Sequence, residues 1–314
     1  MTALKNPPNV TIIFSTFNGG QKLEKTLQTF TELLHPPPGG LNIIAVNNNS
    51  SDNSSEILTN YKHKLPITII NEPQQGKNFA LNAALKEAHG ELIVFTDDDV
   101  LADKHWILQL TESARTHPEF DIFGGTICPS WPSTPPKWIA HTTNLGMLYA
   151  ITPDIDDGEI PAWSVWGPNM AIRRSALKKG GFFSTQVGPD GSNDYIMGSE
   201  TEFLNRLEKA GHRARFVKSA VIYHQIRSEQ MSRKWALQRY FRFGRSSYKL
   251  GNDRQDTKHR ISGVERWLWV AFIKNALART VMKPINGYPD QIKLEEKGMI
   301  LKGQIHQSKP QSQK

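Results

Sequence analysis

Three consecutive carboxylates, Asp97, Asp98 and Asp99, follow the apolar stretch at residues 91–95. That stretch has the length and composition of a buried strand, so the aspartates are expected where the strand ends. Several negative charges at the edge of a core are costly unless a cation or a hydrogen-bond network holds them. We therefore expect a divalent metal that carries a diphosphate. The alternative is a strand-to-helix turn in which the three aspartates are solvated helix caps.

The segments before residue 91 alternate between strand and helix patterns. Apolar runs at residues 10–14, 41–46 and 67–70 predict buried strands. Three helices are predicted between and after these strands, and each has an apolar face that is expected to pack on the sheet. The residues of the three faces are, in order, Leu23, Leu27, Phe30 and Leu34; Ile57, Leu58 and Tyr61; and Ala80, Ala84 and Ala88. This order predicts an α/β fold with a mostly parallel sheet flanked by helices. Ligands bind at the carboxyl ends of strands in such sheets, so the polar turns that follow the strands are expected to form one pocket.

The second half of the chain is less regular. A helix is predicted over residues 106–116 and a strand over residues 121–127. Ser199 and Glu202 have the Ser-x-x-Glu spacing of a capping box at the start of a helix. Short strands are predicted at residues 215–217 and 220–223, and they end at His224.

Tryptophans are scattered among prolines around residues 129–161. Trp131, Trp138 and Trp163 are either a cover for a sugar substrate, whose rings stack on flat apolar faces, or the packing of an irregular subdomain. The sequence leaves both interpretations open.

The 314 residues carry a formal net charge of +8. The positive balance suits an anionic partner such as a phosphorylated substrate, an acidic membrane surface or nucleic acid. A single cysteine, Cys128, excludes an intrachain disulfide and suits a reducing compartment. We find no apolar signal-peptide core near the N-terminus and no run long enough for a transmembrane helix, so we expect a cytoplasmic protein.

Six motifs in chain order resemble those of an inverting glycosyltransferase of family 2 with the GT-A fold, a Rossmann-like architecture. The matching segments are residues 15–18, 46–52, 76–82, 97–99, 167–171 and 198–203. Each motif alone is weakly specific, whereas six in this order are specific. The resemblance covers about residues 10–250. No Gly-x-Gly-x-x-Gly follows the first strand, which argues against a Rossmann oxidoreductase.

The resemblance implies a nucleotide-sugar donor, linked to UDP or GDP, and a divalent cation, Mg²⁺ or Mn²⁺. In the family the last acid of the Asp-x-Asp motif ligates the metal, and here that acid is Asp99. Asp97 and Asp98 are assigned to nucleotide-sugar binding. The implied acceptor is a saccharide or a lipid-linked sugar, in the synthesis of a bacterial cell-surface polysaccharide or glycolipid.

Inversion by a single displacement needs a base that takes the proton of the acceptor hydroxyl. The family places this base in a pair of acids at a helix start, and the matching pair here is Ser199-Glu200. We assign the base to Glu200. Glu202 is the competitor, which the expected capping box would occupy. The remaining alternative is that Glu200 is an ordinary acid of the first helical turn.

Four further residues match nucleotide-sugar-binding positions. Thr16 and Asn18 match the turn that contacts the nucleotide base, and Asn47 stands where the family usually has an aspartate. Lys77 either contacts phosphate or is a surface lysine. Asn82, in the same motif as Lys77, is expected to brace a loop and not to touch substrate.

His224 follows a strand where many family members have a histidine near the metal. A neutral imidazole there could be a metal ligand, and an imidazolium could bind phosphate. The alternative is a structural histidine at a strand end.

We expect three regions: a transferase domain at residues 1–225, a basic and aromatic helical extension at 226–300, and a disordered tail at 301–314. The extension alternates cations with aromatic rings, a pattern that suits RNA, diphosphate or an anionic bilayer. The cations are Arg233, Lys234, Arg239, Arg242 and Arg245. The apolar stretch at residues 267–273 is either an interfacial helix beside a lipid-linked acceptor or a helix packed on the domain.

Two functions of different classes account for these features. The first is the metal-dependent glycosyltransferase, with peripheral contact at the inner face of an anionic membrane and no role for nucleic acid. The second is a non-catalytic module that binds nucleic acid or an anionic membrane on a nucleotide-binding fold. The second uses the net charge but leaves the carboxylates at the strand end unexplained.

Overall fold

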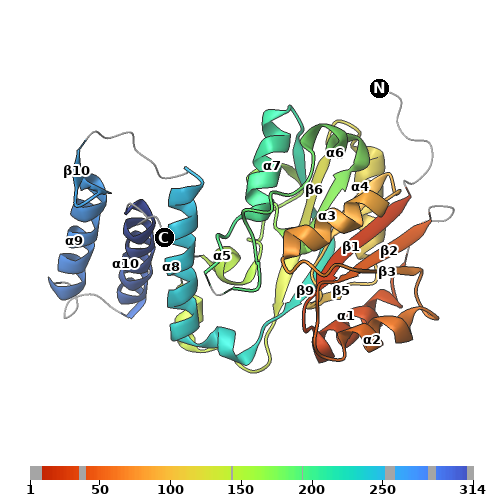
Figure 1. The fold of residues 1–314 in the computed structure, drawn as a ribbon, viewed down its shortest axis with the longest axis horizontal. Helices are drawn as coiled ribbons and strands as arrows, with labels where there is room; N and C mark the ends of the chain where they lie inside the picture. Colours follow the sequence, from red (N-terminus) through yellow and green to blue (C-terminus); the bar gives the residue numbers. More distant parts are fainter. Residues whose placement is uncertain are drawn as a thin grey trace. The chain divides into compact units, whose positions relative to one another are not determined.

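The computed structural model describes residues 9–34, 40–142, 144–192, 194–251, 259–281 and 288–309. The chain divides into two compact units (Figure 1). Unit 1 comprises Met1–Ser130, Ala150–Gly191 and Gly198–Gln225, and unit 2 comprises Trp131–Tyr149, Ser192–Met197 and Ile226–Lys314. Residues 131–149 and 192–197, which lie within the domain expected at residues 1–225, belong to unit 2.

Unit 1 is built on a mixed sheet. Among the described residues its strands are β1 (Val10–Thr16), β2 (Leu41–Asn47), β3 (Ile67–Asn71), β4 (Leu92–Phe95), β5 (Val100–Ala102), β6 (Ile122–Ser130), β7 (Gly158–Ile160), β8 (Met170–Arg173) and β9 (Ala214–Gln225). Their order is β3-β2-β1-β4-β8-β6-β9-β5, and β7 pairs with β9. The neighbours from β3 to β4 are parallel, as predicted, whereas β8 runs antiparallel between β4 and β6.

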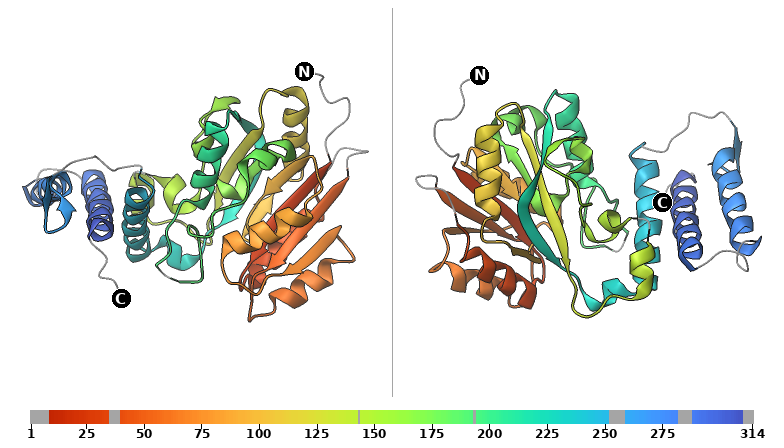
Figure 2. Two further views of the ribbon diagram at one scale, coloured as in Figure 1. Left: turned by 45° about the horizontal axis from the view of Figure 1, so that its top comes forward. Right: turned by 180° about the vertical axis from the view of Figure 1, so that it is seen from behind.

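Helices cover both faces of this sheet (Figures 1 and 2). They are α1 (Gly20–Phe30), α2 (Ser54–Tyr61), α3 (Lys77–Glu87), α4 (Trp106–Thr116), α6 (Arg174–Gly180) and α7 (Ser199–Lys209). Residues of α1, α2 and α4 pack with Ile12 and Phe14 of β1, while residues of α3, α6 and α7 pack with Ile13. Successive side chains of a strand point to opposite faces, so the uninterrupted apolar run of β1 fills two cores.

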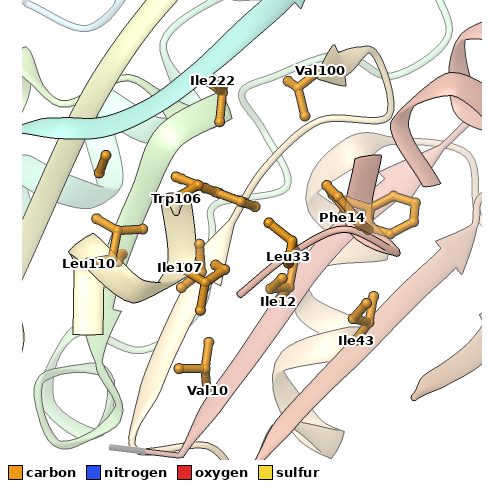
Figure 3. Packing of buried hydrophobic residues seen from close by; sticks show 14 of the residues in the cluster. Val10, Ile12, Phe14, Leu33, Ile43, Val100, Trp106, Ile107, Leu110 and Ile222 are labelled. Atoms are coloured by element: carbon orange, nitrogen blue, oxygen red, sulfur yellow. The ribbon is translucent and has the colours of Figure 1, made fainter. Parts of the chain in front are cut away.

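The core on the α1 and α4 side holds the long indole of Trp106 (Figure 3). Trp106 is fully buried, stacks on Phe30 and donates its indole N–H to Asn169 Oδ1 at 2.8 Å. Asn169, also fully buried, donates to the backbone carbonyls of Thr126 and Ala220 at 3.0 and 2.8 Å. The Asn169 side-chain amide therefore links α4, β6 and β9 through hydrogen bonds in the core.

Two local predictions in unit 1 are wrong. Leu34 was placed on the inner face of the first helix, but α1 ends at Phe30 and Leu34 is 46% exposed. The turn after Phe30 breaks the helical period, so Leu33 is buried in its place. The two short strands predicted before His224 form one strand, β9, whose pairing with β6 shifts register between Gly125 and Thr126.

Unit 2 contains mainly helices. Its elements include η1 (Lys137–His141), α5 (Leu145–Tyr149), η4 (Ser228–Met231), α8 (Arg233–Lys249), the hairpin of β10 (Arg260–Ile261) and β11 (Val264–Glu265), α9 (Arg266–Val281) and α10 (Tyr288–Ser308). Helix α10 packs against both α8 and α9 (Figure 2). Gly244 of α8 and Gly303 of α10 permit this, since a Cβ at either position would collide with the backbone of the facing helix.

The expectation of a disordered tail over residues 301–314 is wrong for its first part. Helix α10 continues to Ser308, and Leu301 and Ile305 are buried in a cluster with Tyr248 and Leu268. These two apolar residues lie one helical turn apart, so a mostly polar segment still has a buried stripe. Residues 310–314 lie outside the described part of the chain.

The tryptophans divide between packing and exposure. In unit 2, Trp131 packs edge-on against Tyr149 and Trp138 is 6% exposed, so both pack the subdomain. In unit 1, Trp163 is 57% exposed. No helix in the described ranges is long and apolar enough to cross a membrane.

Candidate active site

The turns after β1, β2 and β4 meet at one edge of the sheet, as predicted. Parallel pairing places Thr16 opposite Asn47, and the Asn48 N–H donates to the Thr16 carbonyl at 2.9 Å. The Thr16 hydroxyl donates to Asp98 Oδ2 at 2.5 Å. Parallel strands end at a common edge, so residues about 80 positions apart become neighbours there.

Asp98 is the aspartate that accepts the hydrogen bond of the Thr16 hydroxyl. Burial, followed by the negative charges of Asp99 and Asp97, raises the pKa of Asp98 to about 7, although the Thr16 hydrogen bond works in the opposite direction. The Thr26 hydroxyl donates to the Asp98 backbone carbonyl at 2.9 Å and so holds the backbone of the turn against α1. The carboxylates are thus held by a local network, and their crowding still favours an added cation.

Lys77 joins the aspartate turn to the helix start at residues 199–200. Its ammonium lies 2.7 Å from Asp97 Oδ1 and 3.0 Å from Glu200 Oε1. Carboxylates on both sides raise the pKa of Lys77 above its ordinary value, although burial alone would lower it. Lys77 is therefore not a plain surface lysine, since two carboxylates engage its ammonium.

Glu200 lies in the first turn of α7 and remains partly accessible, with 23% of its side chain exposed. Burial would raise its pKa, but the Lys77 ammonium, a backbone N–H and the Ser199 hydroxyl together hold the pKa of Glu200 below its ordinary value. The Ser199 hydroxyl donates to Glu200 Oε2 at 2.8 Å. Glu200 is consequently an ionised carboxylate fixed through both oxygens.

The expected capping box at Ser199 is wrong. The N-cap of α7 is Gly198, whose φ of 97° lies in the left-handed region and suits glycine, and no side chain among the described residues caps this helix end. Glu202 pairs with Arg206 one turn later, with its Oε1 2.7 Å from the Arg206 Nε. Glu202 thus has a structural partner, as expected, but the partner is Arg206 on the same helix and not the N-terminal end of the helix.

Asp99 and His224 come together although they are 125 positions apart in the sequence. Antiparallel pairing of β5 with β9 puts His224 opposite Val100, and His224 Nε2 lies 3.5 Å from Asp99 Oδ2. The ammonium of Lys22 lies 3.8 Å from the same oxygen and donates to the Gln225 carbonyl at 2.6 Å. Asp99 thus has two nitrogen-bearing side chains beside it.

This pair of donors fits Mg²⁺ or Mn²⁺. A carboxylate oxygen and an imidazole nitrogen suit Mn²⁺, and Mg²⁺ commonly takes one or two carboxylates with substrate phosphates. Within the ranges that the structure describes, no three His, Cys, Asp or Glu side chains are grouped to hold a metal. A cation at Asp99 and His224 would therefore complete its coordination with diphosphate and water.

The residues assigned to the nucleotide base build the loops after β1 and β2. Asn18 is exposed, has a φ of 55°, and its side-chain oxygen accepts from the Ser51 N–H at 2.8 Å. Asn47 donates to Asn71 Oδ1 at 3.2 Å and accepts from the Ser50 N–H. Both amides are therefore held at the strand edge, next to Thr16 of β1.

Two helical asparagines of α3 brace a loop of the same unit. Asn82 donates to the Phe183 carbonyl and accepts from the Phe183 N–H, both at 2.9 Å, so the expected bracing role is confirmed. Asn78 donates to the carbonyls of Ser184 and Val187. This bracing fixes the start of α3, and with it Lys77.

Sequence reasoning missed Lys22 and Asn48. Lys22 lies on an amphipathic helix, where a lysine normally faces solvent, so nothing in the pattern marks it. Asn48 donates to the carbonyls of Glu72 and Gln74 and accepts from the Gly76 N–H at 2.7 Å. The run of three asparagines after β2 was the available signal for Asn48, because amides often organise turns.

Comparisons with known proteins identify the family of the chain. A model of a family described as glycosyl transferase family 2 matches residues 11–181. The succinoglycan biosynthesis protein ExoM of Rhizobium meliloti is 24% identical over 232 residues, which cover 73% of this chain and 71% of ExoM. The probable glycosyltransferase YdaM of Bacillus subtilis is 25% identical over 246 residues, covering 71% of this chain but only 52% of YdaM.

Two solved structures have the same fold. The mannosyltransferase PcManGT of Pyrobaculum calidifontis, in complex with GDP-Man and Mn²⁺, superposes with a TM-score of 0.59 at 20% identity, covering 91% of this chain and 78% of its own. S. aureus TarS 1–349 in complex with UDP-GlcNAc gives a TM-score of 0.57 at 14% identity, covering 97% and 93% of the two chains. At these identities the likeness concerns the fold, and both neighbours confirm the predicted GT-A architecture with helices at its C-terminal end.

Proposed function

The chain belongs to glycosyl transferase family 2, and from that premise we propose that it transfers a sugar from a nucleotide-sugar, linked to UDP or GDP, to an acceptor hydroxyl with inversion at the anomeric carbon. One observation carries this proposal: Lys77 bridges Asp97 on the strand-end turn and Glu200 on α7. A carboxylate turn suited to a diphosphate and an ionised carboxylate suited to a base thereby share one site.

Glu200 is the base in this proposal. It takes the proton of the acceptor hydroxyl while the acceptor oxygen bonds to the anomeric carbon and the bond from that carbon to the diphosphate breaks. The base must be ionised before the reaction, and Lys77 with Ser199 keeps it so. The same contacts lower the basicity of Glu200. A weak base is sufficient here, because the acceptor hydroxyl becomes more acidic as its oxygen bonds to the anomeric carbon.

Asp99 and His224 are the residues that would hold a divalent cation. Such a cation, when bound, neutralises the charge that develops on the departing nucleoside diphosphate. Thr16, Asn18 and Asn47 would orient the nucleoside at the strand edge, and Asp98 supports the turn from within. Lys77 is assigned to positioning Glu200 and Asp97, in place of direct phosphate binding.

We propose a role in the synthesis of a cell-surface polysaccharide or glycolipid. ExoM is named for succinoglycan biosynthesis, and it covers most of this chain. The acceptor would be a saccharide or a lipid-linked sugar, consistent with an enzyme that works on the cytoplasmic side of a membrane.

Helix α9 is the surface that we assign to membrane contact. Val270, Ile273, Leu277 and Val281 recur every three or four residues and are 41%, 53%, 59% and 63% exposed. The opposite side of α9 packs on α10, where Asn275 donates to the Leu294 carbonyl at 3.1 Å.

Helix α9 carries Arg266, Lys274 and Arg279 and no acidic residue. An apolar stripe on a cationic helix is typical of interfacial helices on anionic bilayers.

The basic segment of unit 2 does not favour the nucleic-acid alternative. Arg233 pairs with Glu295, Arg239 donates to the Met147 carbonyl at 2.8 Å, and Arg245 pairs with Asp194. These cations hold unit 2 together and do not form an open basic face. A phosphate backbone would need several such cations at once.

The test is the melting temperature of the full chain with UDP, GDP and their sugar conjugates, with and without Mn²⁺. A ligand that binds the native state raises the melting temperature by mass action. We expect a metal-dependent rise with one nucleotide class, and its loss in Asp99→Asn. A nucleotide shift that is equal without metal would remove the metal from the proposal. No shift with any nucleotide would contradict it.

Membrane contact has a separate test, flotation with phosphatidylcholine vesicles with or without phosphatidylglycerol. The double variant Ile273→Ser/Leu277→Ser is expected to abolish co-flotation with anionic vesicles. Ala276→Ser, an exposed substitution on the same helix but off the stripe, serves as the control. Equal flotation of all three proteins would exclude the α9 stripe.

A further inference from the structure

A groove in unit 2 lies between α8 and α10 and next to the segment at residues 192–197. Its volume is about 490 Å³, within the range of small-molecule sites. Helix α8 contributes Gln238, Phe241, Arg242 and Arg245, which recur at one helical face. Helix α10 contributes Met299 and Lys302, one turn apart, and Asp194 completes the lining.

The groove is preformed by the close approach of the two helices. At Gly244 an added Cβ would meet the Ile300 backbone, and at Gly303 it would meet the Phe241 backbone. The two helix backbones are therefore in contact beside the groove and cannot move closer to fill it. A preformed site avoids the cost of ordering its walls when a ligand binds.

Arg245 is the buried member of the groove lining. Its side chain is 8% exposed, pairs with the Asp194 carboxylate and contacts Gln307 Oε1 at 3.2 Å. It also donates to the Asp194 backbone carbonyl at 3.3 Å. Arg245 thus fixes the neighbouring segment, and its charge is matched by the single carboxylate of the lining.

Arg242 and Lys302 are the other two cationic side chains of the lining. The Arg242 guanidinium lies over the Tyr195 ring, 4.6 Å from its centroid, a cation–π contact within the groove. Lys302 is an exposed lysine on the facing helix. A planar guanidinium on α8, an ammonium on α10 and the Gln238 amide line the same groove, and these groups bind the oxygens of a phosphate or a diphosphate.

The remaining walls are apolar. Phe241 and Met299 are half-buried and line the same cavity. A free inorganic anion would leave them unused, whereas a phosphate ester with an apolar portion would cover them. We propose that this groove binds a ligand that carries a phosphate or diphosphate group next to an apolar moiety. The proposal rests on residues of unit 2 alone and is independent of the transferase chemistry in unit 1.

Calorimetry of the full chain with pyrophosphate, in the presence of a chelator, tests the phosphate part. The chelator removes metal-dependent binding at Asp99. We expect saturable binding with a Kd of about 1 mM or tighter. Arg242→Gln and Lys302→Gln should each weaken binding about tenfold, because each removes a charge-assisted contact. Lys297→Gln, an exposed lysine of α10 outside the groove, should leave it unchanged.

Flotation with phosphatidylcholine vesicles that contain phosphatidic acid distinguishes the sources of the phosphate, and it is carried out in the Ile273→Ser/Leu277→Ser background so that the membrane contact assigned to α9 does not contribute. Binding to vesicles that is lost in Lys302→Gln identifies a lipid head group, and pyrophosphate binding without it identifies a soluble phosphate ester. Lys302 is exposed, so its variant keeps the test valid even if Arg242→Gln unfolds the protein. Absence of both kinds of binding, or binding that Lys302→Gln leaves intact, would overturn the proposal.

Discussion

The ammonium of Lys77 lies 3.0 Å from Glu200 Oε1, across 123 positions of sequence. The same ammonium lies 2.7 Å from Asp97 Oδ1. A single cation therefore fixes the distance between the helix start that carries the base and the turn that carries the aspartates. Since both contacts are largely shielded from water, each is stronger than an exposed ion pair would be.

Replacing Lys77 with Met should reduce kcat by about 10²-fold, because it removes the partner that orients and ionises the base. The acid limb of the pH–rate profile should move to higher pH, since only the backbone N–H and the Ser199 hydroxyl would still oppose the rise in the Glu200 pKa that burial causes. Steady-state rates from pH 4 to pH 8 provide the measurement. Lys86→Met, an exposed lysine at the end of the same helix, should leave the profile unchanged. An unshifted acid limb in Lys77→Met would contradict the positioning role.

Glu200→Gln should lower the transfer rate by about 10³-fold, within the usual contribution of general-base catalysis. The nucleotide-induced rise in melting temperature should remain, because the donor does not need the base. Glu202→Gln should retain activity and lose only an ion pair worth less than about 0.5 kcal/mol. Loss of transfer in Glu202→Gln together with retained transfer in Glu200→Gln would contradict the assignment of Glu200 as the base.

The lowered pKa of Glu200 predicts a specific pH dependence of stability. In the folded state Glu200 titrates below its ordinary value of 4.5, so folding favours the ionised form. The resulting stabilisation is fully present above a pH of about 4.5 and is lost as the pH falls through the folded pKa. The free energy of unfolding of wild type and Glu200→Gln should therefore differ by a constant amount at neutral pH and converge in acid. A difference that grows in acid would mean that folding raises the pKa of Glu200 and would contradict the prediction.

His224→Gln should weaken Mn²⁺ binding by about tenfold or more, as losing one nitrogen donor next to Asp99 implies. Metal affinity is measurable by calorimetry with the donor's nucleoside diphosphate present, and it does not require turnover. His212→Gln removes a histidine that instead pairs with Asp121 and should not change metal affinity. Equal affinities in wild type and His224→Gln would assign His224 a structural role.

Asn169→Ala should destabilise the protein by about 2–4 kcal/mol, because it leaves the Trp106 N–H and two backbone carbonyls without partners in the core. Denaturant unfolding provides the measurement. Asn82→Ala, which removes two hydrogen bonds in a less buried place, should cost less. A smaller loss for Asn169→Ala than for Asn82→Ala would show that the buried amide is not the main tie.

The parallel half of the sheet was predictable because its physical cause is local. Apolar runs such as residues 10–14 fill both cores in alternation, and short connections leave few topologies. The aspartate turn was predictable for the same reason, since it directly follows an apolar strand. Strands β5 and β8 were missed because they are short and pair with antiparallel neighbours far away in the chain: β5 with the later strand β9, and β8 with the earlier strands β4 and β6.

The sequence by itself determined the fold class, the family and the identity of the acids at the strand edge, since these depend on local composition and on motif order. Only the tertiary structure decided which groups meet: Lys77 with Glu200, His224 with Asp99, and Arg242 and Lys302 in one groove. The reason is physical. Local patterns record burial and turns, whereas the partner of a charged side chain is set by strand pairing and helix packing between segments far apart in the chain.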